Sequence, residues 1–210
     1  MRVLIPIKPL RAAKSRLAPV LPSEERMRLV LWMLERVLRS CREAGISEVF
    51  LVGGDPWTTE LGRRYGTRFL PELGQNLNQT LERALALVRG EEACLIVAAD
   101  LPLLRPEELA RMVRLGKAWN AAVLAPSRDG GTNALLLPPA SAWTPRFGPH
   151  SAARHRSQLV AAGAVVREIR TLGLMHDVDR PHDLTEAVRS LPGFPLRESL
   201  ASSKTVVEPS

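Results

Sequence analysis

The sequence lacks the features that mark membrane-spanning, secreted and disordered proteins. No apolar run approaches the roughly 18 residues that a transmembrane helix needs, and the stretch before Pro6 is too short for a signal peptide. The two cysteines, Cys41 and Cys94, lie inside apolar runs, which predicts buried thiols in a reducing cytoplasm. With 45% hydrophobic and 24% charged residues, we expect one folded domain over residues 1–195 and a flexible tail over 196–210.

Aromatic residues are also scarce, at 4% of the chain, although the formal net charge is +7. Proteins that bind single-stranded nucleic acid stack bases on aromatic side chains, so this scarcity disfavours that class. The excess charge is local, because residues 1–23 contain five cations and no acid, whereas later arginines are interleaved with Asp and Glu. This distribution predicts a polyanion site near residues 8–16, with neither nucleic acid nor a membrane as a partner.

Apolar stretches of strand length alternate with helical patterns along the chain. The longest helical pattern runs from Ser23 to Ala44, and Ala93–Ala99 is continuously apolar, as in a central strand covered on both faces. This alternation predicts a three-layer α/β/α fold with a mostly parallel sheet, to which the late stretches 133–137 and 165–169 are candidates for an antiparallel addition. The other expected strands are 3–7, 48–52, 67–70 and 121–125, and the other expected helices are 58–65, 77–88, 106–118, 151–162 and 181–190.

The loop after the first expected strand contains no glycine. Neither G-x-G-x-x-G nor a P-loop is present, which argues against a Rossmann dehydrogenase and a Walker-type NTPase. In their place stand Lys8, Arg11, Lys14 and Arg16. Because the first βα loop of a doubly wound sheet is a usual phosphate site, these cations predict a triphosphate held by charge. A basic surface loop without function is the alternative.

Three aspartates are candidate metal ligands. Asp100 follows the apolar strand at its carboxyl end, where ligands bind in open α/β sheets. Asp177 and Asp179 are one residue apart, so an extended segment places both side chains on the same side. Carboxylate oxygens suit a hard cation such as Mg²⁺, and the three acids together predict metal-assisted nucleotidyl chemistry. Helix capping and turn formation are the alternatives for each acid taken alone.

Two later loops are candidates for holding a second substrate. Thr132 brings a hydroxyl after two glycines, and Phe147-Gly148-Pro149-His150 leads into a helix that we expect Ser151 to cap. Free N–H groups and a hydroxyl at a helix start suit a carboxylate or phosphate, although plain turn chemistry explains the same pattern. The four histidines, His150, His155, His176 and His182, lack zinc-like spacing, and we expect surface or capping positions, with His150 a candidate for lining the site.

Taken together, five motifs resemble those of a known family. They are Lys14-Ser15-Arg16-Leu17-Ala18, Ala98–Leu103, Gly131–Ala134, Phe147–Ser151 with Arg154-His155, and Asp177-Val178-Asp179. Their order is similar to that in the guanylyltransferases of deazaflavin coenzyme (F-420) biosynthesis, which are MobA-like nucleotidyltransferases acting on phosphoenolpyruvate or 2-phospho-L-lactate. The resemblance covers residues 2–190 and implies a GT-A-like sheet, Mg²⁺, GTP and a small phospho-acid, with the downstream deazaflavin transferase as a candidate partner.

The resemblance also implies roles for individual residues. The metal-binding acids correspond to Asp100, Asp177 and Asp179, and the phosphate-binding lysine to Lys14, so that Lys14 and Asp100 are the expected catalytic residues. The residues expected to hold the phospho-acid are Thr132, Gly148 and Ser151. The nucleotide side is expected to use Lys8, Lys14, Arg16 and Asn78. Asn78 belongs to Gly74-Gln75-Asn76-Leu77-Asn78, where Gln75 and Asn76 separate the glycine from the Leu-Asn of the family's usual Gly-Leu-Asn.

The chemistry agrees with these residues. The phosphate of the acceptor is itself the nucleophile and is already ionised near neutral pH, so neither a catalytic histidine nor a cysteine is required. Positioning the anions and neutralising their charge is sufficient. Two alternatives remain: a related nucleotidyltransferase for a molybdopterin or sugar phosphate, disfavoured by the missing glycine-rich loop, and a basic nucleic-acid-binding module. Among the acceptors, the resemblance to bacterial members favours phosphoenolpyruvate.

Overall fold

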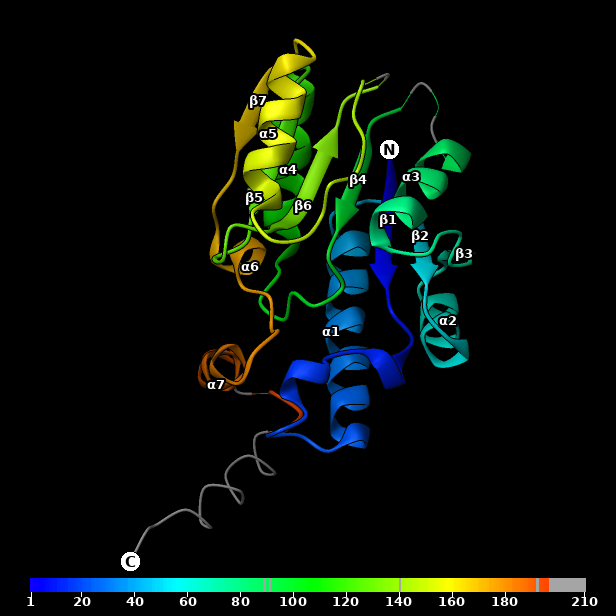
Figure 1. Cartoon of the computed structure of the whole chain (residues 1–210), viewed down its shortest axis with the longest axis vertical. Helices are drawn as coiled ribbons and strands as arrows, with labels where there is room; N and C mark the ends of the chain where they lie inside the picture. Colours follow the sequence, from blue (N-terminus) through cyan, green and yellow to red (C-terminus); the bar gives the residue numbers. More distant parts are fainter. Residues whose placement is uncertain (89, 91, 140, 192, 197–210) are drawn as a thin grey trace, which may run out of the picture.

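Seven strands of the protein form one sheet in the order β3-β2-β1-β4-β6-β5-β7, as seen in the computed structural model (Figure 1). The structure describes residues 1–88, 90, 92–139, 141–191 and 193–196. The strands are β1 (Arg2–Ile7), β2 (Glu48–Gly53), β3 (Arg68–Leu70), β4 (Cys94–Val97), β5 (Ala122–Pro126), β6 (Thr132–Leu137) and β7 (Val166–Glu168). Every strand expected from the sequence is present, with ends shifted by a few residues at most.

The sheet is mostly parallel, as predicted, with one antiparallel strand. β1 pairs in parallel with both β2 and β4, whereas β6 runs antiparallel to β4 on one side and to β5 on the other. The second candidate for an antiparallel addition is wrong, because β7 runs parallel to β5. β6 therefore carries Thr132 at its amino end to the edge where the carboxyl ends of β1 and β4 also lie (Figure 1).

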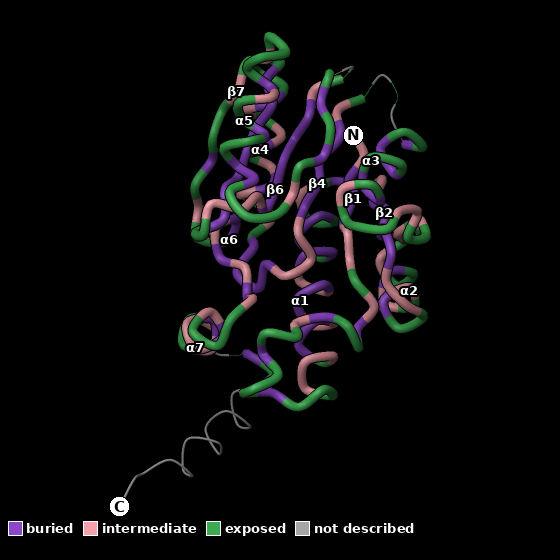
Figure 2. The backbone as a smooth tube through the Cα atoms, viewed as in Figure 1, coloured by how far each residue is buried: buried purple, intermediate pink, exposed green. Residues whose placement is uncertain are grey.

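Helices cover both faces of the sheet, which confirms the three-layer architecture. The helices are α1 (Ser23–Glu43), α2 (Pro56–Arg64), α3 (Leu77–Val88), α4 (Pro106–Trp119), α5 (Ser151–Ala161), α6 (Leu172–Met175) and α7 (Pro181–Ser190). One face packs against α1, α2, α4 and α6, and the other against α3 and α5. Cys41 and Cys94 are buried as predicted, and Figure 2 shows buried residues along α1 and the central strands. None of the described helices combines the length and the apolar character needed to cross a bilayer.

A separate apolar cluster fixes the loop that follows β1. Leu10 and Leu17 are buried in this cluster with Met33 of α1 and Leu184 of α7. Two short 3₁₀ turns, Leu10–Ala12 and Ser15–Leu17, carry these leucines inward, so the cations between them project from an anchored loop. These turns and α6 were not predicted, because three or four residues are too few to show a helical period.

The chain after α7 returns to the same cluster, which contains Phe194 and Leu196. The tail that we expected over residues 196–210 lies outside the described residues, apart from Leu196, which is buried.

Candidate active site

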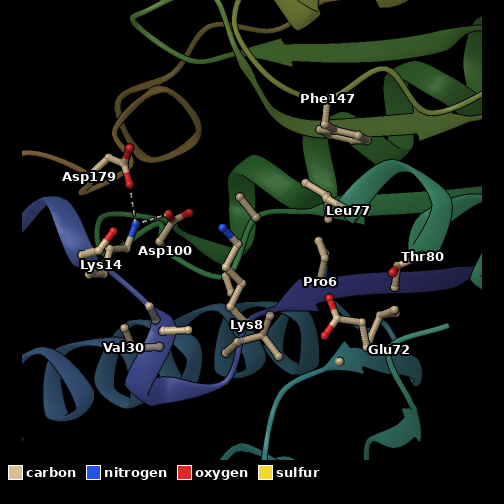
Figure 3. Close-up of a pocket in the computed structure, with 18 of the residues that line it drawn as sticks. Pro6, Lys8, Lys14, Val30, Glu72, Leu77, Thr80, Asp100, Phe147 and Asp179 are labelled. Atoms are coloured by element: carbon tan, nitrogen blue, oxygen red, sulfur yellow. Dashed lines mark hydrogen bonds and ion pairs between the residues drawn. The ribbon is translucent and has the colours of Figure 1, made fainter. Parts of the chain in front are cut away.

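A cavity of about 460 Å³ lies at the carboxyl ends of β1, β2 and β4, where an open α/β sheet binds its ligands. Its lining comes from the loop after β1, the end of β4, the start of β6 and the segment before α7. Figure 3 shows two ends: Lys14, Asp100 and Asp179 lie at one, Pro6, Glu72 and Thr80 at the other, and Lys8 lies between them. We call the first the charged end. We call the second the apolar end, because Pro6 and Leu77 lie there beside the two polar side chains.

Lys14 is the centre of the charged end. Its Nζ donates hydrogen bonds to Asp100 Oδ2 and, over 3.3 Å, to Asp179 Oδ1, and Arg16 Nη1 donates to Asp179 Oδ2 over 2.6 Å. Lys14 adopts the left-handed conformation, with φ +54°, which few residues other than glycine do and which turns its side chain toward the aspartates. Burial acts to lower the pKa of Lys14, but the carboxylates of Asp100 and Asp179 outweigh it and the net shift is upward. Lys14 is therefore a cation at neutral pH.

The two other predicted acids are held by different partners. Asp177 Oδ1 accepts a hydrogen bond from Asn133 Nδ2 over 3.1 Å, and the same buried amide donates to Leu174 O. Burial, and then the charge of Asp100, raises the pKa of Asp177 to about 6. Burial also acts to raise the pKa of Asp179, but Lys14 and Arg16 outweigh it and lower that pKa. The three predicted acids thus lie at the same end of the cavity: Asp100 follows β4, and Asp177 and Asp179 come from the segment between α6 and α7.

The donor set fits a hard cation in its chemistry but not yet in its arrangement. Burial and the charge of Asp100 raise the cost of ionising Asp177, and a divalent cation held by these carboxylates would lower that cost. Within the part of the chain that the structure describes, no three His, Cys, Asp or Glu side chains are arranged to hold a metal ion. Both oxygens of Asp179 are in ion pairs, with Lys14 and Arg16, and one oxygen of Asp100 is paired with Lys14.

The predicted nucleotide-side residues divide into two groups. Lys8 and Arg16 line the cavity together with Lys14. Asn78 does not: its Nδ2 donates to Phe147 O over 3.2 Å and its Oδ1 accepts from Phe147 N over 2.6 Å. In this structure Asn78 therefore secures the loop that carries Phe147, while its neighbour Leu77 lines the cavity.

The residues expected to hold a second substrate differ in how accessible they are. Thr132 lines the cavity, and Gly148 is exposed with φ +124°, a conformation that L side chains rarely adopt. Ser151 has no exposed surface, and its Oγ donates to Thr132 Oγ1 over 3.0 Å. The expected N-cap role of Ser151 is wrong, because α5 begins at Ser151 and its N-cap is His150, whose side chain makes no capping hydrogen bond.

The expectation for the histidines is wrong at two positions. His155 and His176 are buried, with 0% and 1% of their surface exposed, whereas His150 and His182 are on the surface, as expected. His155 contacts Thr132 through Nδ1 over 3.0 Å. The available signal was the spacing of Ser151, His155 and Leu159, which repeats every four residues on the buried face of α5. His155 was missed as a residue of the site because this spacing was not used.

Comparison with known proteins agrees with this geometry. Residues 1–209 match the family described as "Guanylyl transferase CofC like". The phosphoenolpyruvate guanylyltransferase of Sphaerobacter thermophilus is 39% identical over 192 residues, covering 90% of this chain and 93% of that protein. The 2-phospho-L-lactate guanylyltransferase of Methanocaldococcus infernus is 32% identical over 209 residues, covering 100% of this chain and 94% of that protein.

Solved structures support the fold independently of sequence. A candidate nucleotide-diphospho-sugar transferase from Desulfovibrio desulfuricans G20 superimposes with a TM-score of 0.77 at 18% identity, over 98% of this chain and 96% of that one. This likeness confirms the GT-A-like nucleotidyltransferase fold. Since the family match spans nearly the whole chain and both relatives exceed 30% identity over almost their full length, the chain belongs to the CofC-like family of guanylyltransferases.

Proposed function

We propose that this protein transfers GMP from GTP to phosphoenolpyruvate and releases pyrophosphate, as a step of deazaflavin coenzyme (F-420) biosynthesis. The observation that carries the proposal is one cavity that joins a cationic loop, suited to a triphosphate, to the hydroxyl of Thr132, suited to a second anion. The greater identity to the phosphoenolpyruvate enzyme, 39% against 32%, supports that acceptor over 2-phospho-L-lactate. The two buried thiols suit the reducing cytoplasm, which is the location we propose.

In this reaction an oxygen of the acceptor's phosphate attacks the α-phosphorus of GTP. The new P–O bond forms as the bond to the β-phosphate oxygen breaks, and pyrophosphate leaves with that electron pair, so no proton has to be removed from the nucleophile. Lys14, Lys8 and Arg16 neutralise the triphosphate and the leaving pyrophosphate. Asp100 and Asp177, with Asp179, would hold Mg²⁺, which supplies further neutralisation of the phosphates when it is bound.

The apolar end of the cavity suits the guanine base. Pro6, Val52, Leu77 and Ile96 provide a surface for a flat ring, and the carboxylate of Glu72 points into the cavity beside Pro6 (Figure 3). Guanine presents two N–H donors on its Watson–Crick edge, whereas adenine presents one donor and one acceptor. A carboxylate only accepts, so Glu72 pairs with guanine and opposes the acceptor of adenine.

The test is a pyrophosphate-release assay in which GTP, ATP and CTP are each combined with phosphoenolpyruvate, 2-phospho-L-lactate and 3-phosphoglycerate. We expect turnover with GTP and the highest kcat/KM with phosphoenolpyruvate. No release with GTP and any of the three acids would overturn the proposal. Glu72→Gln should lower the preference for GTP over ATP by about 10- to 100-fold, the range for a hydrogen bond to a charged group, while Glu60→Gln, on the outer surface of α2, should leave it unchanged.

A further inference from the structure

A chain of buried polar groups lies behind Thr132. The backbone N–H of Arg146 donates to His155 Nε2 over 3.1 Å, and His155 Nδ1 lies 3.0 Å from Thr132 Oγ1. Ser151 Oγ donates to the same Thr132 oxygen, also over 3.0 Å. His155 and Ser151 have no exposed surface, whereas Thr132 is half-buried and lines the cavity. This series of hydrogen bonds therefore ends at Thr132, which lines the cavity.

The backbone partner determines which nitrogen of His155 carries the proton. A peptide N–H only donates, so Nε2 must be the nitrogen with the lone pair. In a neutral imidazole the proton is then on Nδ1, and Nδ1–H donates to Thr132. The ring is enclosed by Trp143 and Phe147, whose ring centres are 5.0 and 4.8 Å away. Burial, and then the charge of Arg154, lowers the pKa of His155 to about 4, which keeps the ring neutral at physiological pH.

Ser151 completes the hydrogen bonding of Thr132. Because Ser151 is fully buried, leaving its O–H unpaired would be costly, and Thr132 Oγ1 is the acceptor it reaches. The hydroxyl oxygen of Thr132 has two lone pairs, which accept from His155 and Ser151. Only the O–H of Thr132 is left, and it is available to the cavity as a donor.

From this arrangement we infer that His155 is a positioning residue for the acceptor substrate, acting through Thr132. With Ser151 it restricts Thr132 to donating, so the group that binds there must present an acceptor such as an anionic oxygen of the phospho-acid. The inference rests on the proposed function for the identity of that ligand. It also changes the role of Ser151 from a direct contact to a support for Thr132.

The tautomer of His155 provides a test that needs no substrate. In ¹⁵N-detected NMR of the full chain, the resonances of His155 are identified as those lost in His155→Phe. We expect one neutral ring with its proton on Nδ1, unchanged between about pH 7.5 and 5.5 because the ring is buried. Protonation of Nε2, or a charged ring in this range, would overturn the inference whether or not the enzyme is active.

A double-mutant cycle then tests whether His155 acts through Thr132. His155→Phe retains an aromatic ring between Trp143 and Phe147 but removes both nitrogens. We expect it to raise the KM for phosphoenolpyruvate about fivefold, the ratio for the loss of one ordinary hydrogen bond, with the KM for GTP unchanged. In a Thr132→Val background the same substitution should raise the acceptor KM no further. His155→Asn, whose amide N–H lies near the position of Nδ1, should restore the value.

The outcomes separate the inference from the proposed function. If the wild-type protein releases no pyrophosphate with any of the three phospho-acids, the proposed function fails, and the NMR result still decides the tautomer. If the wild-type protein is active but the effects of His155→Phe and Thr132→Val multiply, His155 acts independently of Thr132 and the inference is wrong. Equal changes in both KM values together with a lower melting temperature would show a purely structural role and would also overturn it.

Discussion

The charged end of the cavity differs in its electrostatics from the polar groups behind Thr132. These groups, which we call the hydroxyl chain, are the Thr132 and Ser151 hydroxyls, the His155 ring and the Arg146 N–H. At the charged end, Lys14 is paired with Asp100 and Asp179, so a triphosphate bound there as proposed would compete with ion pairs that already exist. Behind Thr132 every group is neutral, and the hydrogen bonds leave a single donor free. On the proposed function, the first arrangement would exchange partners when the triphosphate binds, whereas the second is organised beforehand and would need no rearrangement.

The two arrangements also differ in what the fold needs from them. A buried lysine is tolerated only with its counter-charges, so removing Asp100 or Asp179 leaves the charge of Lys14 only partly compensated. The hydroxyl chain contains no formal charge, and losing one member costs about the free energy of one hydrogen bond. We therefore expect large functional effects at the charged end and smaller, more separable ones at Thr132.

The largest effect is expected for Asp100→Asn. The change is nearly isosteric, but it removes one charge from the pair that would hold Mg²⁺ and one partner of Lys14. We expect kcat for pyrophosphate release to fall by more than about 100-fold at saturating Mg²⁺, and Asp177→Asn to behave alike. Glu107→Gln, an exposed acid on α4, is the matched control. Undiminished turnover in Asp100→Asn with a normal melting temperature would remove this residue from the catalytic machinery.

Lys14→Met should produce the next largest effect, on the nucleotide. Loss of a charge-assisted contact to the triphosphate typically costs about 1.5–3 kcal/mol, or roughly 10- to 150-fold in the KM for GTP. The KM for phosphoenolpyruvate should change much less, because Thr132 supplies that contact without Lys14. Lys117→Met, on the exposed surface of α4, should leave both values unchanged. An unaltered dependence on GTP in Lys14→Met would assign Lys14 to the support of Asp100 and Asp179 alone.

The same comparison shows how far the sequence could predict the site. Lys14, Arg16, Asp100 and Asp179 are charged, and Lys14 and Arg16 stand close together in a segment without acids, so their type and place in the chain were sufficient to select them. The fold was also predicted from patterns within single segments. Strands show as short apolar runs, and long helices repeat their apolar residues over several turns. α6 and the 3₁₀ turns were missed because, at four and three residues, they span no more than about one helical turn.

The hydroxyl chain was predicted only in part, because its members depend on contacts between distant segments. Thr132, Arg146 and His155 come from β6, a loop and α5, and nothing local in the sequence states that a histidine on α5 faces a strand threonine. Ser151 was selected, but as an exposed helix cap, since a hydroxyl at a helix start is usually one. Its burial followed from the packing of α5 on the sheet, which a single sequence does not reveal.

The burial of His155 predicts a measurable dependence of stability on pH. The folded protein holds its pKa at about 4, below the usual value near 6.5, so the unfolded chain takes up the proton first. Protonation therefore favours unfolding, and stability falls as the pH drops from about 6.5 toward 4. Relative to His155→Phe, the wild-type protein should lose about 2 kcal/mol between pH 7.5 and 5, measured by urea unfolding. Parallel curves for the two proteins would show that His155 is not buried as a neutral ring.

The smallest effect is expected for Ser151→Ala, which separates support of Thr132 from direct contact with the ligand. Removing the buried hydroxyl takes one donor from Thr132 and should cost about 1 kcal/mol of stability, with a rise of a few fold in the KM for phosphoenolpyruvate. Because Ser151 acts through Thr132, its effect on that KM should disappear in a Thr132→Val background. Ser157→Ala, on the exposed face of α5, is the matched control and should change neither quantity. A tenfold or larger rise in KM that persists without the Thr132 hydroxyl would mean that Ser151 contacts the acceptor itself.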